Sequence, residues 1–181
     1  MTQLQRGTAL PAPHIARERI QLVDARNRPC GSAWRHTMRR FRFWHRATYI
    51  VVRNARGEIC VQRRTLIKEV FPGGLDLAAG GVVGAGEAEH LAARRELAEE
   101  LGIRGVALRS AGSFVHAEGG NHIHGSLFLV DHDGPLTLQV EEVAEVFWRS
   151  PGEALALDGV TPDTRQAVLA LLATGLLEGS S

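Results

Sequence analysis

The segment GVVGAGEAEHLAARRELAEELGI, residues 81–103, decides the fold of this chain. Its first six residues include three glycines, whereas residues 87–101 contain no glycine or proline and are rich in Ala, Leu, Glu and Arg, all good helix formers. Gly102 follows, and glycine is the usual residue just beyond a helix end. The segment therefore predicts a glycine-rich loop, a helix from Glu87 to Leu101 and a second loop.

Three glutamates lie on one face of this expected helix. Glu96, Glu99 and Glu100 are spaced i, i+3 and i+4, which places them within an arc of roughly 100°. Their mutual repulsion costs on the order of a few tenths of a kcal/mol per pair. Carboxylate oxygens suit Mg²⁺, which leaves positions open for water and substrate phosphates. The face therefore predicts a Mg²⁺ site, although a solvated acidic surface would explain the carboxylates taken alone.

The whole segment resembles the Nudix box. Gly81, Glu87 six positions later, and RELAEELGI at residues 95–103 occupy every fixed position of that motif. The resemblance to the Nudix hydrolase family implies an α/β (α+β) fold. In that family the fold is an α/β/α sandwich with a central mixed sheet, and the box forms its loop–helix–loop.

The same resemblance implies roles for individual residues. It assigns Mg²⁺, or Mn²⁺, to Glu96, Glu99, Glu100 and, as an additional candidate ligand, the Gly80 carbonyl. Arg95 and Glu87 would orient the box. Glu99 or Glu100 could also be the base that activates water, and the sequence does not separate ligand from base.

The remaining sequence suggests two regions, a leader over residues 1–44 and a Nudix domain over residues 45–177. Within the leader, residues 37–44 are basic and aromatic and suggest a short helix. In the domain, a hairpin is expected from strands around a turn at residues 54–57. Further strands and a closing helix are expected at residues 75–80, 106–115, 124–130, 145–149 and 161–177.

A second resemblance concerns the stretch RRTLIKEVFPG, residues 63–73, which is similar to the corresponding stretch of type I isopentenyl-diphosphate isomerase, a relative with the Nudix fold. It implies that Arg64 and Lys68 hold a diphosphate, and the chemistry agrees, because Arg binds phosphate bidentately and Lys as a point charge. His45 falls near the metal-binding histidine of that family.

The catalytic groups of the isomerase are missing from this sequence. That enzyme has a cysteine directly before the box glycine and a histidine directly after it, where this chain has Gly80 and Val82. It also carries Glu-x-Glu on a later strand, whereas residues 119–130 contain no acid. Hydrolysis is therefore favoured over isomerisation.

Several other side chains have open roles. Glu142 or Glu145 could supply a further metal ligand or base from outside the box, or both could belong to an exposed acidic turn. His122 and His124 alternate along an expected strand and would share one face, where they could contact substrate or metal. The role of His45 is equally open.

Composition limits the class of function. The chain has 181 residues and a net charge of +1, which argues against a dedicated nucleic-acid binder. Cys30 and Cys60 are expected to be buried or partly buried free thiols. No stretch has the 18 or more apolar residues that span a bilayer, and residues 1–13 lack a signal-like run, so no membrane association and a cytoplasmic location are expected.

These observations combine into one expected function. The chain is expected to be a Mg²⁺-dependent pyrophosphohydrolase whose partner is a small-molecule diphosphate, either a nucleoside diphosphate or a related X-linked organic diphosphate. Two alternatives stay open, a Nudix protein that senses nucleotide without turnover and an isopentenyl-diphosphate isomerase. The leader could also pair two subunits into a homodimer.

Overall fold

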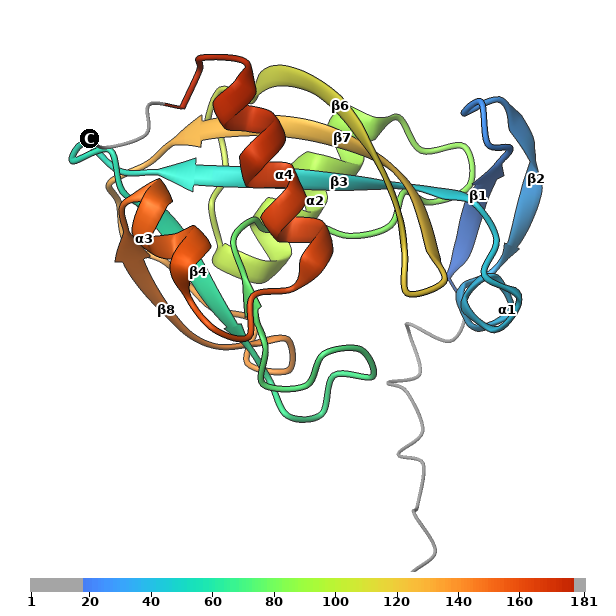
Figure 1. Cartoon of the computed structure of the whole chain (residues 1–181), viewed down its shortest axis with the longest axis horizontal. Helices are drawn as coiled ribbons and strands as arrows, with labels where there is room; N and C mark the ends of the chain where they lie inside the picture. The colour runs from blue at the N-terminus through green and yellow to red at the C-terminus, as the bar shows by residue number, and fades with distance from the viewer. Residues whose placement is uncertain (1–17, 178–181) are drawn as a thin grey trace, which may run out of the picture.

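A mixed sheet forms the centre of the structure, a computed structural model that describes residues 18–177. Its long strands are β3 (His45–Arg53), β7 (Asn121–Asp131) and β6 (Arg109–Glu118). β3 and β7 are parallel and stay in register along the whole of β3, while β7 and β6 form an antiparallel pair. Figure 1 shows these three strands side by side.

A second group of strands continues the sheet. β4 (Ile59–Arg64) leaves β3 at the expected turn, and the two strands pair only between Arg53 and Ile59. From there β4 pairs with β8 (Val143–Arg149) and with the two-residue strand β5 (Leu75–Asp76), both antiparallel. The sheet therefore opens between β3 and β4 (Figure 1).

Helices cover both faces of the sheet. α2 (Glu89–Leu101) lies behind β3 in Figure 1, while α4 (Pro162–Ala173) crosses in front with α3 (Pro151–Ala156) beside it. Side chains of β3 alternate between these layers, as a strand requires. Tyr49 and Val51 join the core under α4, and the intervening Ile50 joins the core under α2. The expected α/β/α sandwich is confirmed.

The helix of the glycine-rich segment forms as its sequence predicts. Ala93, Leu97 and Leu101 are all buried against the sheet. Gly102 adopts the left-handed conformation with φ 70° and its N–H donates to the carbonyl of Ala98, which ends the helix. The first helical residue is Glu89 rather than Glu87. None of the described helices has the length and apolar character needed to cross a membrane.

The described part of the leader packs onto the same structure. It contains β1 (Arg19–Val23), β2 (Pro29–Trp34) and α1 (Arg35–Phe41). β1 pairs with β3 through Leu22 and His45, and Ile20, Met38 and Val82 form a small buried cluster. The expected short helix is present, but α1 begins two residues before residue 37 and ends at Phe41. The rest of the leader, residues 1–17, lies outside the described residues.

Three local expectations are wrong. The strand expected at residues 75–80 is only Leu75–Asp76, because residues 79–84 pair with β3 and β1 through single bridges interrupted by glycines. The strand expected from residue 106 begins at Arg109. Cys60 is buried as expected, but Cys30 lies on the edge strand β2 and is exposed; both are free thiols.

The packing of α2 gives a stability prediction. Leu97→Ala removes a side chain that is 1% exposed, and such truncations lower the free energy of unfolding by about 2–5 kcal/mol. The matched control is Leu169→Ala on α4, where the leucine is 51% exposed and the loss should be small. Urea unfolding followed by circular dichroism measures both. Equal losses would contradict the assignment of Leu97 to the core.

Candidate active site

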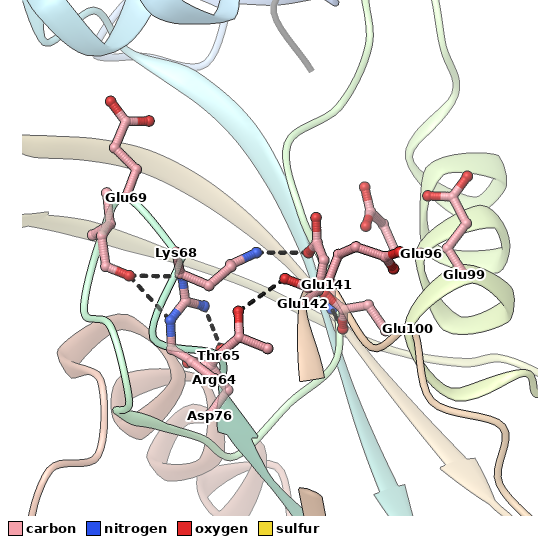
Figure 2. A network of polar contacts seen from close by, with 12 residues as sticks. Arg64, Thr65, Lys68, Glu69, Asp76, Glu96, Glu99, Glu100, Glu141 and Glu142 are labelled. Carbon is pink, nitrogen blue, oxygen red and sulfur yellow. Dashed lines mark hydrogen bonds and ion pairs between the residues drawn. The ribbon is translucent and has the colours of Figure 1, made fainter. Parts of the chain in front are cut away.

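The acidic face of α2 lies against the glycine-rich loop (Figure 2). Glu96 and Glu100 are buried, while Glu99 is half exposed. The Gly80 N–H donates to Glu100 Oε2 at 3.1 Å. Burial raises the pKa of Glu96 to about 7, and burial together with the charges of Glu96 and Glu142 raises the pKa of Glu100 well above its ordinary value. The two buried carboxyl groups therefore resist being ionised together unless a cation balances their charge.

Arg95 links α2 to the glycine-rich loop that precedes it. Its guanidinium donates to both carboxylate oxygens of Glu87 at 3.0 Å, to Glu96 at 2.7 Å and to Glu99 at 3.3 Å. Glu87 in turn accepts the Gly84 N–H at 2.9 Å. The hydrogen bonds with Glu87 are the main reason that the pKa of Arg95 is raised. These contacts fix the position of Glu96 relative to the loop.

Two glycines of the loop have no room for a side chain. A Cβ atom at Gly81 would lie 2.6 Å from a carboxylate oxygen of Glu96. Gly80 has φ 147°, and a Cβ there would lie 1.9 Å from the Thr48 carbonyl oxygen of β3. This backbone therefore leaves no place at position 80 for the cysteine of an isomerase.

The donor set fits a hard divalent cation. It consists of carboxylates, with the Gly80 carbonyl beside them, which accepts no hydrogen bond from residues 18–177. The three glutamates do not converge, because Glu99 lies beside Arg95, and no three His, Cys, Asp or Glu side chains in the described part of the chain form a ready metal cluster. Within residues 18–177, Glu96 forms an ion pair with Arg95 and Glu100 forms none, so a divalent cation would balance their charge.

A cavity of about 800 Å³ opens in front of this face. It extends from Glu96, Glu99 and Glu100 to α1 on one side and to the start of α4 on the other. Its volume lies within the range of small-molecule sites.

The end of β4 and the loop between β4 and β5 place the two residues expected to bind phosphate (Figure 2). Arg64 donates to the Val70 carbonyl at 2.8 Å and to Asp76 at 2.5 Å, so its guanidinium holds the loop in shape. Lys68 forms an ion pair with Glu142 at 2.6 Å. Burial opposes ionisation of Glu142, but the charge of Lys68 and its hydrogen bond leave the pKa of Glu142 lowered.

Two further expected residues differ in position. Glu142 lines the cavity, whereas Glu145 lies on β8 in an ion pair with Arg63 at 2.5 Å and is not part of the cavity wall. His122 and His124 share one face of β7, as expected, and each ring lies 5.0 Å from the Trp44 ring.

His45 is buried at the start of β3. Its Nδ1 lies 3.0 Å from the Phe43 carbonyl oxygen, and burial lowers its pKa to about 4. It is therefore neutral at pH 7.

Cationic residues of α1 are a part of the cavity that the sequence did not single out. Arg35 and Arg39 of α1 line it, together with Arg42, which directly follows the helix. Arg35 pairs with Glu18 at 2.7 Å, and its charge lowers the pKa of both Glu96 and Glu142 although burial keeps the pKa of Glu96 raised. Its buried Nε has no hydrogen-bond partner within residues 18–177. The basic stretch was visible in the sequence, but only the fold shows which arginines face the carboxylates.

Comparison with known proteins agrees with this geometry. The NUDIX domain family profile matches residues 43–171. An uncharacterized Nudix hydrolase of Pseudomonas aeruginosa is 48% identical over 138 residues, which cover 76% of this chain and 82% of that protein. Another from Yersinia pestis is 45% identical over 157 residues, covering 86% of each chain. The crystal structure of DR0079 from Deinococcus radiodurans superposes with a TM-score of 0.75 at 26% identity, over 84% of this chain and 98% of that one.

The close contact at Gly81 gives a test of the metal site. In Gly81→Ala the new methyl group displaces the Glu96 carboxylate, so Mn²⁺ should bind about 10- to 100-fold more weakly. The matched control is Gly152→Ala in α3, where an added Cβ meets no atom within 4 Å. Calorimetric titration of Mn²⁺ into the folded variants measures the effect. Unchanged binding in Gly81→Ala would show that Glu96 does not need its present position.

The buried histidine gives a pH prediction. The folded pKa of His45 is about 4 and the ordinary value is 6.5, so the folded state resists protonation. The stability associated with neutral His45 is present above pH 6.5 and is lost as the pH falls toward 4, by on the order of 3 kcal/mol at most. The free energy of unfolding of wild type should fall more steeply over this interval than that of His45→Gln. An equal pH dependence of the free energy of unfolding in the two proteins would contradict the lowered pKa of His45.

Proposed function

The chain belongs to the NUDIX domain family and is a Nudix pyrophosphohydrolase, and from this premise we propose that it uses Mg²⁺, or Mn²⁺, to cleave the diphosphate linkage of a nucleoside diphosphate or a related organic diphosphate. The observation that carries the proposal is the complete box folded with two buried carboxylates, Glu96 and Glu100, at the wall of a cavity of substrate size.

In this proposal the residues of α2 hold the reacting centre. Glu96 and Glu100 would hold the cation, and Glu99 would join them if its carboxylate turned away from Arg95. When bound, the cation neutralises charge on the phosphate oxygens and lowers the pKa of a coordinated water. Arg95 and Glu87 keep the helix and loop in register, which holds Glu96 and the Gly80 carbonyl at fixed positions.

The reaction itself needs a nucleophile, a proton acceptor and a leaving group. Water attacks one phosphorus atom, the bond from that phosphorus to the bridging oxygen breaks, and the second phosphate leaves. The proton of the water passes to a carboxylate, for which Glu99, Glu100 and Glu142 are the candidates. Glu142 has a lowered pKa beside Lys68, so it is ionised and able to accept a proton at neutral pH.

Basic groups on the opposite wall suit the phosphates. Lys68 reaches the cavity from the β4–β5 loop, and Arg35 and Arg39 reach it from α1. Arg64 supports this wall indirectly, because its guanidinium is already bonded to the loop carbonyls and Asp76. We propose that Lys68 and the α1 arginines contact the phosphates and that Arg64 positions the loop carrying Lys68. Glu145, paired with Arg63 outside the cavity, has no direct part in this scheme.

The proposal is tested by phosphate or pyrophosphate release from nucleoside diphosphates, nucleoside triphosphates, sugar nucleotides, dinucleoside polyphosphates and isopentenyl diphosphate, each with Mg²⁺ or Mn²⁺. Glu100→Gln should lower kcat by about 100-fold or more, the scale of losing one group that stabilises charge or accepts a proton. The matched control is Glu141→Gln, because Glu141 is exposed and does not line the cavity.

Each outcome has a distinct meaning. Metal-dependent turnover that falls in Glu100→Gln and persists in Glu141→Gln supports the proposal and identifies the substrate class. Tight metal-dependent nucleotide binding without turnover of any compound would replace it with a nucleotide sensor.

A further inference from the structure

The cavity has two ends of different chemistry. Near α1 and the β4–β5 loop its wall carries the basic side chains Arg35, Arg39 and Lys68, each in an ion pair with a glutamate. At the other end, beside the start of α4, it carries the ring of His116 and two carboxylates, Asp76, which is paired with Arg64, and Asp163, which forms no ion pair within residues 18–177. Carboxylates repel phosphate groups, so a diphosphate bound at the basic end directs its organic group toward α4.

At the α4 end, the ring of His116 has a fixed hydrogen-bonding state. The side-chain amide of Gln166 donates from Nε2 to the Val115 carbonyl at 2.7 Å, which leaves its Oε1 as an acceptor. Nδ1 of His116 lies 2.7 Å from that Oε1 and must therefore carry the hydrogen. When the ring carries this one hydrogen, Nε2 is an acceptor, and none of the hydrogen bonds within residues 18–177 uses it.

Asp163 presents a second acceptor beside it. The Tyr49 hydroxyl donates to Asp163 Oδ2 at 2.9 Å, and burial raises the pKa of Tyr49 well above its ordinary value, so this hydroxyl keeps its proton. No donor among the described residues reaches Oδ1 of Asp163. Asp163 and Gln166 are one helical turn apart on α4, so they share a face, and Gln166 holds His116.

The neighbouring Asp76 does not provide a third acceptor of this kind. Its two oxygens already accept from Arg64 at 2.5 Å and from Thr161 at 2.6 Å. Of these three side chains, His116 and Asp163 each keep an acceptor, Nε2 and Oδ1 respectively, that no donor within residues 18–177 reaches. A hydrocarbon group placed against them would leave both without a donor, which is costly in a site that excludes water.

We propose that His116 and Asp163 are the residues that select the organic group of the substrate, because they accept hydrogen bonds from hydroxyl or amino groups, such as those of a nucleoside, and disfavour an isoprenoid chain. This inference rests on the proposed function for the placement of the diphosphate. The donors have two sources in a nucleotide, the sugar hydroxyls and the exocyclic amino group of the base.

Binding without turnover tests this inference separately from hydrolysis. The probes are non-hydrolysable α,β-methylene compounds with Mg²⁺, namely the adenosine, the 2′,3′-dideoxyadenosine, the purine riboside and the isopentenyl derivatives, with methylenediphosphonate as the bare diphosphate mimic. Wild type should bind the adenosine derivative about 10- to 100-fold more tightly than the isopentenyl derivative, the scale of satisfying one or two acceptors. Loss of affinity in the dideoxy compound assigns the donors to the sugar, and loss in the purine riboside assigns them to the base.

Two variants test whether His116 and Asp163 cause the preference for the adenosine derivative. His116→Phe keeps a ring but removes the acceptor, and Asp163→Asn keeps an oxygen for Tyr49 while turning a donor into the cavity. Both should lose the preference for the adenosine derivative and keep the wild-type affinity for methylenediphosphonate. Asp163→Asn preserves the test if His116→Phe does not fold, and His132→Phe, outside the cavity, is the matched control.

The outcomes separate the two proposals. Equal affinity of wild type for the adenosine and isopentenyl derivatives, or an undiminished preference in the folded variants, would overturn the assignment of His116 and Asp163. Hydrolysis of diphosphates without a preference for donor groups would leave the proposed function standing and remove only this inference. Tighter binding of the adenosine derivative by a protein that hydrolyses none of the compounds would leave this inference standing and remove the proposed function.

Discussion

The catalytic geometry depends on the hydrogen bonds that the guanidinium of Arg95 donates. It joins Glu87, from the end of the glycine-rich loop, to Glu96 and Glu99 on the helix that follows. Because Glu87 also accepts the Gly84 N–H, the loop backbone and the helix surface form one rigid unit. The two glycines facing that unit are then constrained by contact, Gly81 against the Glu96 carboxylate and Gly80 against the Thr48 carbonyl of β3.

Three separate parts of the sequence build the cavity in front of that unit. The box provides the carboxylates, α1 and the β4–β5 loop provide basic groups, and β6 with α4 provides uncharged or acidic acceptors. Each part is carried by a different layer of the sandwich or by its edge. A change in α1 or α4 can therefore alter which diphosphate fits while Glu96 and Glu100 stay in place.

Much of the fold around the box could be predicted because its signals are local. The helix ending at Leu101 and the terminating Gly102 follow from local composition, and the structure confirms them, with Ala93, Leu97 and Leu101 buried against the sheet. The roles of Glu96, Glu99 and Glu100 as ligands stay a prediction.

The parts that could not be predicted depend on tertiary contacts. The sequence shows that Arg64 is basic, but not that carbonyls of the following loop and Asp76 occupy its guanidinium. Similarly, His116 and Asp163 are far apart in sequence, and only the packing of α4 on β6 brings them to one cavity. The single-bridge pairing of residues 79–84 with β3 and β1 is likewise set by neighbouring strands, and it explains why the strand expected at residues 75–80 stops at Asp76.

The parallel pairing of β3 with β7 has a consequence for how the chain folds. Its first pair joins His45 to Ile123, so the strands can meet only after the whole intervening segment has closed into a loop. Such non-local contacts raise the contact order and slow folding, because the chain loses conformational entropy on closing the loop before the stabilising contacts have formed. The box and α2 lie inside that segment, and α2 packs against β3. The helix can form early from its own propensity, but its carboxylates reach their buried positions only when the central strands have come together.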